Sequence, residues 1–280
     1  MNFINALIQH SFLQTAMVAG LLAGLGCGVM GSYVVVKRIG YMAGGISHSV
    51  LGGMGAALFF GFSPTLGALL AAVAAAMAIG WIKLRWGAHE DTLIGALWAI
   101  GMSIGVLFTS RTPGYSTDLM SYLFGNILLV SVDQLWEMAV LDVLVIALVA
   151  AFYRQCLAIS FDEEFARLRG VPVSTFYLLF LCLVAITVVM LVQVVGLVLV
   201  IALLTLPAAI AGHYVHTMGR MMLLASVLGA LFTSAGIAVS WQLDLPAGAS
   251  IILLAGVAYV LSALLSELRG QRLATRAVDS

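Results

Sequence analysis

Charged residues are the scarcest class in this sequence. Only 9% of its 280 residues are Asp, Glu, Lys or Arg, whereas 63% are hydrophobic. A soluble domain carries roughly 25% charged residues, so the composition excludes a soluble globular protein and predicts a chain that lies mostly within a lipid bilayer. The 12 basic and 12 acidic residues cancel to a formal net charge of zero. We therefore expect no nucleic-acid partner, since such a partner requires a basic surface.

Lysine and cysteine are also rare. The only lysines are Lys37 and Lys83, and neither follows a glycine. A phosphate-binding P-loop needs a Gly-Lys pair, so this chain has no ATP site of that kind. The three cysteines, Cys27, Cys156 and Cys182, are far apart and form no CxxC pair. They predict neither a disulfide framework nor a thiolate metal site.

Long apolar segments fill most of the chain. A membrane-spanning helix needs about 20 predominantly apolar residues. Nine segments are candidates. One of them, 46–61, is short and contains polar residues, so the number of spans is nine if it crosses the bilayer and eight if it does not. We therefore predict an all-α, polytopic membrane protein with eight or nine transmembrane helices in a single domain, 1–280. Residues 117–131 are predicted to form a short or re-entrant helix. The nine segments are 12–36, 46–61, 64–84, 92–110, 134–153, 175–191, 193–213, 221–241 and 246–266.

The basic residues predict the orientation of these spans. When the loops after the first, third, fifth, seventh and ninth spans share one side, that side holds every Lys and Arg except Arg111. Cytoplasmic loops carry an excess of Lys and Arg, so we expect the N-terminus outside and the C-terminus in the cytoplasm. The residues on the cytoplasmic side are Lys37, Arg38, Lys83, Arg85, Arg154, Arg167, Arg169, Arg220, Arg269, Arg272 and Arg276.

One histidine lies inside a predicted span. His48 stands early in segment 46–61, between Ser47 and Ser49, with Gly44 and Gly52 one helical turn away on either side. Ionisable residues within membrane spans often mark ion pathways, and imidazole binds zinc and other first-row metals. His48 is therefore a candidate metal ligand or gate. The alternative is a neutral histidine bonded to a backbone carbonyl.

One acidic residue has a similar position. Asp142 lies midway along segment 134–153. An aspartate at the centre of a membrane helix costs about 2.5–3.5 kcal/mol on insertion scales, so it requires a partner or a water-filled path. Two interpretations stay open: a hydrogen bond to a neighbouring helix, and a role in handling metal.

Glycines recur at four-residue spacing in several predicted spans. Gly20, Gly24 and Gly28 form one series, and Gly101 with Gly105 forms another. Such faces predict close packing of helix backbones, and a pore lined by backbone is the alternative. Residues 101–105 also match the GxSxG pattern of serine hydrolases, with Ser103 at its centre. That pattern needs a turn between a strand and a helix, so an intramembrane serine protease is only a remote alternative.

A polar segment between two spans has the pattern of a short amphipathic helix. Ser160 and Glu163 are spaced as a capping box, and Gly170 is expected to end the helix. The acidic residues precede the basic ones, which suits the helix dipole. Such a helix lies either on the membrane surface or against a protein partner. The mixed charge favours a protein partner.

Six short segments, in a fixed order along the chain, carry a family resemblance. With them the chain resembles the membrane permeases of bacterial zinc, manganese and iron ABC importers. The segments are Lys37-Arg38 followed by Ile46-Ser47-His48-Ser49; Asp91-Thr92-Leu93-Ile94-Gly95; Leu119-Met120-Ser121-Tyr122-Leu123-Phe124-Gly125-Asn126; Phe161 to Gly170; Ala202-Leu203-Leu204-Thr205-Leu206-Pro207-Ala208-Ala209; and Asp244-Leu245-Pro246-Ala247-Gly248.

The resemblance implies an ATP-driven importer in the bacterial inner membrane, with zinc as the first candidate cargo and manganese or iron as the others. It implies a homodimer of permeases, two cytoplasmic ABC ATPase subunits that bind the ATP, and an extracytoplasmic metal-binding protein. The chain itself would be no enzyme and would hold no permanent cofactor. Its coupling loop, about 155–174, would dock on the ATPase through Phe161, Asp162, Glu163, Glu164, Ala166, Arg167 and Gly170.

The sequence departs from the family pattern at two positions. An aspartate commonly precedes the histidine by four residues in the family, and here that residue is Gly44. Asn126 likewise stands where an aspartate is common. We therefore assign the metal pathway to His48, Ser47, Asn126 and Asp142, with His48 as the metal ligand. The alternative to an ABC importer is an ATP-independent cation channel or proton-coupled metal carrier that uses His48 and Asp142 as a relay.

Overall fold

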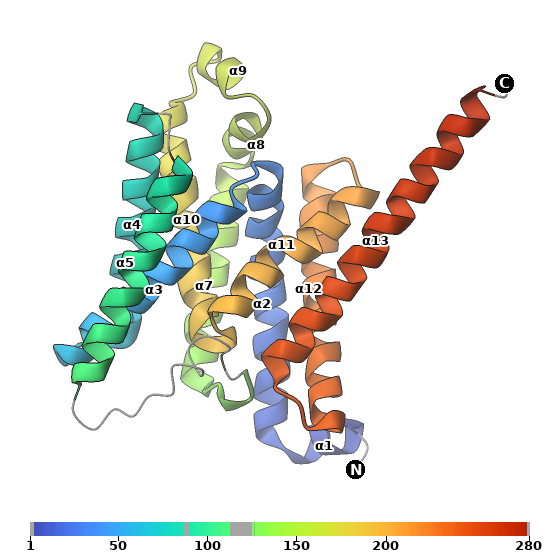
Figure 1. Ribbon diagram of the computed structural model, residues 1–280. Coiled ribbons are helices and arrows are strands. Elements are labelled where there is room, and N and C mark those ends of the chain that lie inside the picture. Colours follow the sequence, from blue (N-terminus) through green and yellow to red (C-terminus); the bar gives the residue numbers. More distant parts are fainter. Residues whose placement is uncertain (1–2, 87–89, 113–124, 126, 279–280) are drawn as a thin grey trace.

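The computed structural model describes residues 3–86, 90–112, 125 and 127–278. Within these ranges the chain forms helices and no strands, which confirms the all-α prediction (Figure 1). Asn126 and most of the predicted helix 117–131 lie outside the described residues. The part of that segment that is described contains a single short 3-10 helix, η1 (Ile127–Leu129).

Nine long helices make up the body of the protein in the described ranges. Eight of them are long and apolar enough to cross a membrane, so the chain is a multi-pass membrane protein. The ninth, α3, is as long as some of the eight but contains less apolar sequence. The nine helices are α2 (Ser11–Val36), α3 (Gly40–Phe59), α4 (Pro64–Trp86), α5 (Glu90–Arg111), α7 (Val132–Ala151), α10 (Val173–Val195), α11 (Leu197–Tyr214), α12 (Met218–Leu243) and α13 (Ala247–Val278).

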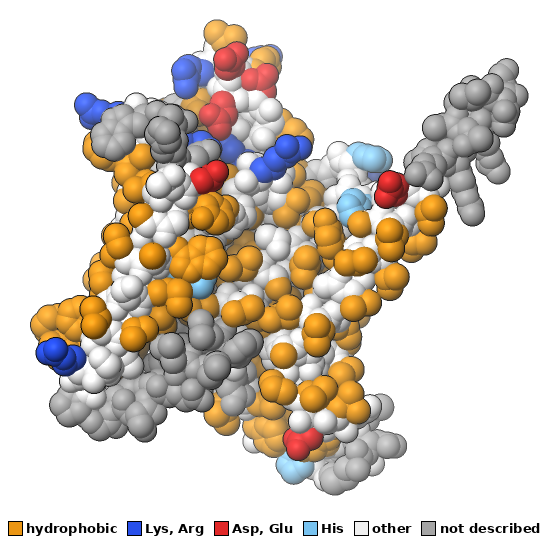
Figure 2. Space-filling view, in the orientation of Figure 1, with side chains coloured by type: hydrophobic (Ala, Val, Ile, Leu, Met, Phe, Trp, Pro, Cys, Tyr) orange, Lys and Arg blue, Asp and Glu red, His pale blue; other side chains and the backbone are white. Residues whose placement is uncertain are grey.

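The long helices alternate in direction, and three short helices lie at the two ends of the bundle (Figure 1). Helix α1 (Phe3–Gln9) lies at one end. Helices α8 (Tyr153–Phe161) and α9 (Glu163–Leu168) lie at the other, which is also where α13 ends. Figure 2 shows Lys and Arg side chains gathered mainly at the α9 end, with a broad hydrophobic band between the two ends. This separation agrees with the charge pattern of the loops.

Helix α3 is the most enclosed part of the bundle. Fourteen of its 20 residues are buried, and α4, α5, α10 and α11 pack around it. It begins at Gly40, whereas the sequence predicted a span from residue 46. The prediction was wrong at this boundary because glycine contributes little hydropathy and has a low helix propensity. Burial between other helices compensates for both.

The corrected boundary moves His48 along the membrane axis. His48 is the ninth residue of α3, so it lies about 12 Å from the first residue along the helix axis. The sequence placed it early in its span, just inside the cytoplasmic end. The structure places it near the middle of a 20-residue helix.

Glycine allows α3 and α5 to pack backbone to backbone. A Cβ atom added to Gly52 would lie 2.7 Å from the carbonyl oxygen of Gly101, and one added to Gly105 would lie 2.7 Å from that of Leu51. On the other side of the bundle, a Cβ on Gly24 of α2 would lie 2.9 Å from the Cα of Ala230 in α12. The packing role predicted for the glycine series is therefore confirmed at these positions.

The GxSxG match is part of this packing surface. Gly101 and Gly105 face α3, and Ser103 is on the exposed side of α5, where its hydroxyl donates to the Ala99 carbonyl at 2.7 Å. The segment is a continuous helix, so the turn that a nucleophilic serine needs is not formed here. The protease alternative is wrong.

Candidate functional site

His48 of α3 is buried against helix α5. Only 6% of the residue is exposed, and its ring stacks on the indole of Trp98 from α5, with the ring centroids 3.9 Å apart and an interplanar angle of 14°. The ring nitrogen Nδ1 has no hydrogen-bond partner among the described residues. A buried nitrogen in this state incurs a desolvation penalty with no bond to offset it. The carbonyl-bonded histidine that the sequence left open is therefore not observed at Nδ1.

The residue one turn before His48 borders the same space. A Cβ atom on Gly44 would lie 3.7 Å from Trp98 and 3.7 Å from the side chain of Ile201 in α11. These are ordinary van der Waals distances, so this position has room for a side chain. Helices α3, α5 and α11 thus meet beside the His48 ring, and the Tyr41 ring lies 6.2 Å from the Trp98 ring. The site is mostly aromatic and aliphatic, with the imidazole of His48 as its candidate metal ligand.

Ser47 is fully buried, but its hydroxyl is directed along its own helix. It donates to the Gly44 carbonyl at 2.7 Å, and the neighbouring Ser49 hydroxyl donates to the Gly45 carbonyl at 2.9 Å. Serine hydroxyls inside helices commonly bond to the preceding turn in this way. The Ser47 oxygen keeps lone pairs that can accept or ligate. No bond to His48 is formed by this hydroxyl.

Asp142 lies in a different part of the bundle. It is 2% exposed, and neither carboxylate oxygen has a hydrogen-bond partner among the described residues. Its Oδ1 atom is packed against Gly26 of α2, so closely that a Cβ on that glycine would clash with it, and Met190 of α10 adjoins the same point. The hydrogen bond to a neighbouring helix that the sequence allowed is not observed. Because His48 packs against α5 and Asp142 against α2 and α10, the structure does not assemble the two into a relay.

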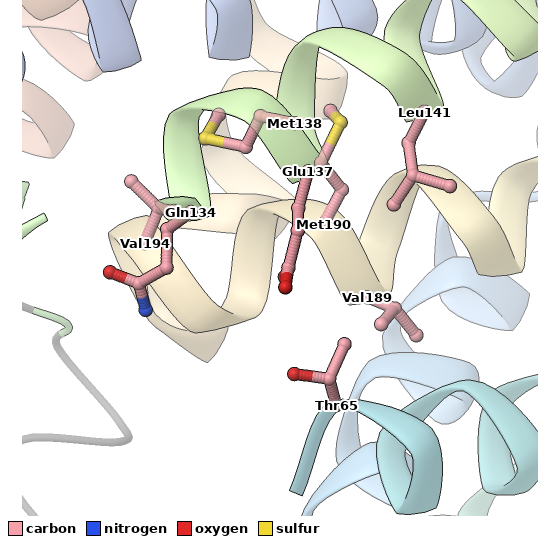
Figure 3. A pocket seen from close by; sticks show the side chains of 8 residues that line it. All are labelled: Thr65, Gln134, Glu137, Met138, Leu141, Val189, Met190 and Val194. Atoms are coloured by element: carbon pink, nitrogen blue, oxygen red, sulfur yellow. The ribbon is translucent and has the colours of Figure 1, made fainter. Parts of the chain in front are cut away.

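A small cavity lies near Asp142, towards the start of α7. It encloses about 10 Å³, enough for about one water molecule. In Figure 3 the Glu137 and Gln134 side chains of α7 extend to the same side as Thr65 of α4, and Met190 lies beside them. Met190 therefore lines this cavity and also adjoins Asp142. The cavity is too small for a hydrated metal ion, and no sequence motif marks its polar residues.

The segment between α7 and α10 forms two helices rather than one. Helix α8 ends at Phe161, and Asp162 caps α9 by accepting a hydrogen bond from the Phe165 amide at 2.9 Å. The predicted capping box of Ser160 and Glu163 was wrong. The Ser160 hydroxyl instead donates at 2.7 Å to a carbonyl of α8, and the adjacent aspartate takes the capping position. The predicted stop is confirmed, since Gly170 has a φ of 77°.

The exposed face of this segment carries three large apolar side chains among its charged residues. Phe161, Phe165 and Leu168 are 67%, 49% and 87% exposed at the end of the bundle. Ala166 is fully buried and packs with Ile159 and Val173, so it supports α9 from within. The sequence placed Ala166 among the docking residues, and burial makes that assignment wrong. The large apolar side chains between the charges are the surface that the charge pattern did not reveal.

The charged residues of α8 and α9 divide into two groups. Glu163 points back to the bundle and forms an ion pair with Lys37 at the end of α2, with 2.8 Å between Nζ and Oε1. Asp162 caps α9, whereas Glu164 and Arg167 are exposed. All of the predicted docking residues except Ala166 are therefore exposed. Glu163 has a second contact that constrains the segment.

Comparisons with known proteins agree with this arrangement. The model of the ABC 3 transport family matches residues 9–266. The chain is 46% identical to an uncharacterized membrane protein of Synechocystis over 91% of each chain. It is 34% identical to the manganese transport system membrane protein MntC of Halalkalibacterium halodurans, covering 96% of this chain and 92% of the relative. The solved structure of PsaBC from Streptococcus pneumoniae in complex with Fab matches 93% of this chain and 94% of its own, with a TM-score of 0.85 and 31% identity.

Proposed function

Because this chain belongs to the ABC 3 transport family, we propose that it is the transmembrane subunit of an ATP-driven importer that moves a divalent transition metal ion into the bacterial cytoplasm. As a family permease it is not itself an enzyme, and ATP is hydrolysed by a separate subunit. The observation that carries the proposal is His48: a buried imidazole with an unpartnered nitrogen near the middle of a mostly buried helix.

A weak site suits a transport pathway. Transported ions must bind well enough to enter and loosely enough to leave. Within the described residues, no three His, Cys, Asp or Glu side chains are placed to hold a metal together. One imidazole from each protomer would make such a weak site. We propose that Ser47 and Asn126 border the same pathway. We propose that Asp142 also belongs to the metal pathway, at a separate position in α7.

Manganese is the first candidate for the cargo, because relatives such as MntC carry manganese transport in their names. Zinc is the second, because imidazole is a favourable zinc ligand, whereas manganese prefers carboxylate and water oxygens. The absence of a carboxylate at Gly44 affects how strongly each of the two metals binds beside His48. Without a carboxylate at this position, a manganese ion passing His48 would keep most of its water ligands, and a zinc ion would bind the imidazole more strongly.

The complete transporter contains several further partners in this proposal. Two permease chains form a homodimer, two ABC ATPase subunits dock at the α9 end, and an extracytoplasmic metal-binding protein delivers the ion to the opposite end. The N-terminus is outside and the C-terminus in the cytoplasm. Two observations support this orientation. Lys and Arg gather at the α9 end (Figure 2). The helices at that end also carry the exposed apolar side chains Phe161 and Leu168.

The ATP-independent carrier is the weaker alternative. It requires a relay between His48 and Asp142, and these residues contact different helices. It also has no use for a solvent-exposed apolar docking surface on α9.

The decisive test is metal uptake by the reconstituted permease–ATPase complex in vesicles. Uptake of manganese should require hydrolysable ATP and should exceed uptake of magnesium and calcium at least tenfold. Zinc is measured in the same panel to rank the two candidates. A complex with an ATPase variant that binds ATP without hydrolysing it serves as the control. Equal uptake with and without hydrolysis would overturn the importer assignment in favour of the carrier.

The docking surface gives a separate prediction. Leu168→Asp should reduce recovery of the ATPase subunit with the purified permease at least tenfold, because a carboxylate in the apolar centre of an interface is desolvated without a partner. Pull-down of the detergent-solubilised complex measures this. Leu129→Asp is the matched control, since Leu129 is 78% exposed in η1, which lies away from α9. If both variants retain the ATPase equally, α9 is not its docking site.

A further inference from the structure

Lys37 forms hydrogen bonds between the body of the permease and the proposed docking segment. Its Nζ atom donates to the Glu163 carboxylate at 2.8 Å and to the Ile159 carbonyl at 3.0 Å. These two acceptors come from α9 and α8, so one ammonium group bonds both helices of the segment. The Lys37 side chain is 8% exposed and that of Glu163 46%. Exposed ion pairs contribute little to stability, but a largely enclosed ammonium group with two acceptors is held more firmly.

The same lysine meets a tyrosine that is bonded to α3. The Lys37 ammonium lies 5.1 Å from the centroid of the Tyr177 ring in α10. Tyr177 is 2% exposed, and its hydroxyl donates to the sulfur of Met42 in α3 at 3.4 Å. A chain of three contacts therefore connects the end of α2 with α9, α10 and α3. The residues that make these contacts are Lys37, Glu163, Tyr177 and Met42. We name these four residues the coupling junction.

The covalent path from this junction to the candidate metal ligand is short. Lys37 ends α2 and α3 begins at Gly40, three residues later, with His48 two turns further along. The intervening turn is hydrogen-bonded: the Arg38 amide donates to the Val35 carbonyl at 3.1 Å, and the Ile39 amide to the Val34 carbonyl at 3.0 Å. Arg38 adopts a left-handed conformation with a φ of 56°. A displacement of Lys37 is therefore passed to α3 through a tight turn.

The other connection from the docking segment is a hydrogen-bonded turn, in which the Gly170 amide donates to the Arg167 carbonyl at 3.0 Å and the Val171 amide to the Ala166 carbonyl at 3.1 Å. The chain leaves α9 through Gly170 and enters α10 at Val173. Gly170 has open space around it, with nothing within 4 Å of where a Cβ would lie. Glycine also permits a wider range of backbone conformations than other residues. This turn connects α9 with α10 alone, whereas the bonds of Lys37 connect α8 and α9 with the end of α2.

We propose that Lys37 is a positioning residue that couples the ATPase to α3, so that movement of α8 and α9 displaces the helix carrying His48. The proposal rests on the importer function above and specifies how its two sites communicate. It assigns Glu163 to transmission rather than to docking. It also assigns Tyr177 to the same link, because this ring contacts the Lys37 ammonium on one side and α3 on the other.

The test separates transmission from assembly in the reconstituted complex. Lys37→Met keeps the aliphatic stem and removes the ammonium group. We expect the ATPase to co-purify and to hydrolyse ATP within twofold of the wild-type rate, while the number of metal ions transported per ATP falls at least tenfold. Lys37→Arg, which retains the donor, should preserve most of that ratio. Arg154→Met removes an exposed positive charge from α8 and serves as the control.

Glu163→Gln examines the same link from its exposed side, where a folding defect is least expected. The ratio of ions to ATP should fall about threefold, because Lys37 retains the Ile159 carbonyl as an acceptor. The double variant Lys37→Met/Glu163→Gln should be no worse than Lys37→Met alone, as expected for residues that act as a pair.

Three outcomes overturn this inference. The first is an unchanged ions-to-ATP ratio in Lys37→Met or, where that variant does not fold, in Glu163→Gln. The second is loss of ATPase binding in Lys37→Met, which would make the lysine a docking residue. The third is additive losses in the double variant. Failure of the importer function itself is distinguishable, because the wild-type complex would then show no ATP-dependent uptake.

Discussion

Replacement of His48 by alanine is expected to lower metal uptake by the reconstituted complex at least tenfold, with assembly of the permease and ATPase unchanged. In the proposed function the imidazole beside Trp98 binds the metal, and tenfold corresponds to about 1.4 kcal/mol, a modest share of one metal–nitrogen bond. Uptake of manganese and zinc is measured at equal free concentrations. The loss should be greater for zinc, because zinc depends more on the imidazole than manganese does.

Two further variants separate ligation from packing. His48→Phe retains an aromatic ring against Trp98 but has no nitrogen, so it should be as defective as His48→Ala while folding better. His10→Ala removes a histidine that immediately precedes α2 and should transport normally. Normal uptake by His48→Phe would show that the ring contributes only its stacking contact, and the metal-ligand assignment would then be wrong.

The Gly44 position offers the converse experiment within the same assay. A Cβ there lies 3.7 Å from its nearest neighbours, so Gly44→Asp can be accommodated one turn before His48. A second ligand should retain the ion longer and slow its release. Gly44→Ala is the matched control for the added volume. Equal release rates in these two variants would show that the carboxylate and the imidazole do not share an ion.

Replacement of Gly101 by leucine is expected to prevent folding of the permease. A Cβ atom at this position would lie 2.7 Å from the Cα of Ser49 and 3.1 Å from the carbonyl oxygen of His48. These atoms belong to the backbone and cannot move aside as a flexible side chain does. Overpacking typically costs about 1–3 kcal/mol, and a backbone clash along the α3–α5 interface should exceed about 3 kcal/mol. The yield of monodisperse protein and the thermal unfolding midpoint measure the effect.

Gly256→Leu is the matched control for this prediction. Gly256 lies in α13, and nothing is within 4 Å of where its Cβ would stand. The variant has the same change in composition and helix propensity, so it should be obtained in near wild-type yield. If the two variants unfold at the same temperature, close approach of α3 and α5 is not essential and the glycine series has another role.

The sequence predicted the helical class and number of spans well because hydropathy reports them directly. The sequence did not predict the start of α3, because Gly40, Gly44 and Gly45 among its first six residues contribute little hydropathy. Nothing local distinguishes such a stretch from a loop. The partners that make it a helix, among them Ile94 of α5 beside Gly45, are about 50 residues away in the chain.

The docking segment shows a similar division. Its existence and its stop at Gly170 follow from local patterns, as does the concentration of charge. Which side chains face outward does not, because a six-residue helix such as α9 is too short to show a clear period. Burial of Ala166 and the pairing of Glu163 with Lys37 both depend on where α9 meets the bundle.

The sequence by itself therefore determined the surroundings of the chain and the residues that are candidates for a function. Scarce charge places the chain in a membrane, one-sided basic residues predict its orientation, and His48 is the candidate metal ligand. The tertiary structure decided the burial of His48, its separation from Asp142 and the ion pair between Lys37 and Glu163. The reason is physical: composition and hydropathy act on each residue locally, whereas burial, stacking and ion pairing require helices that are distant in the chain to pack together.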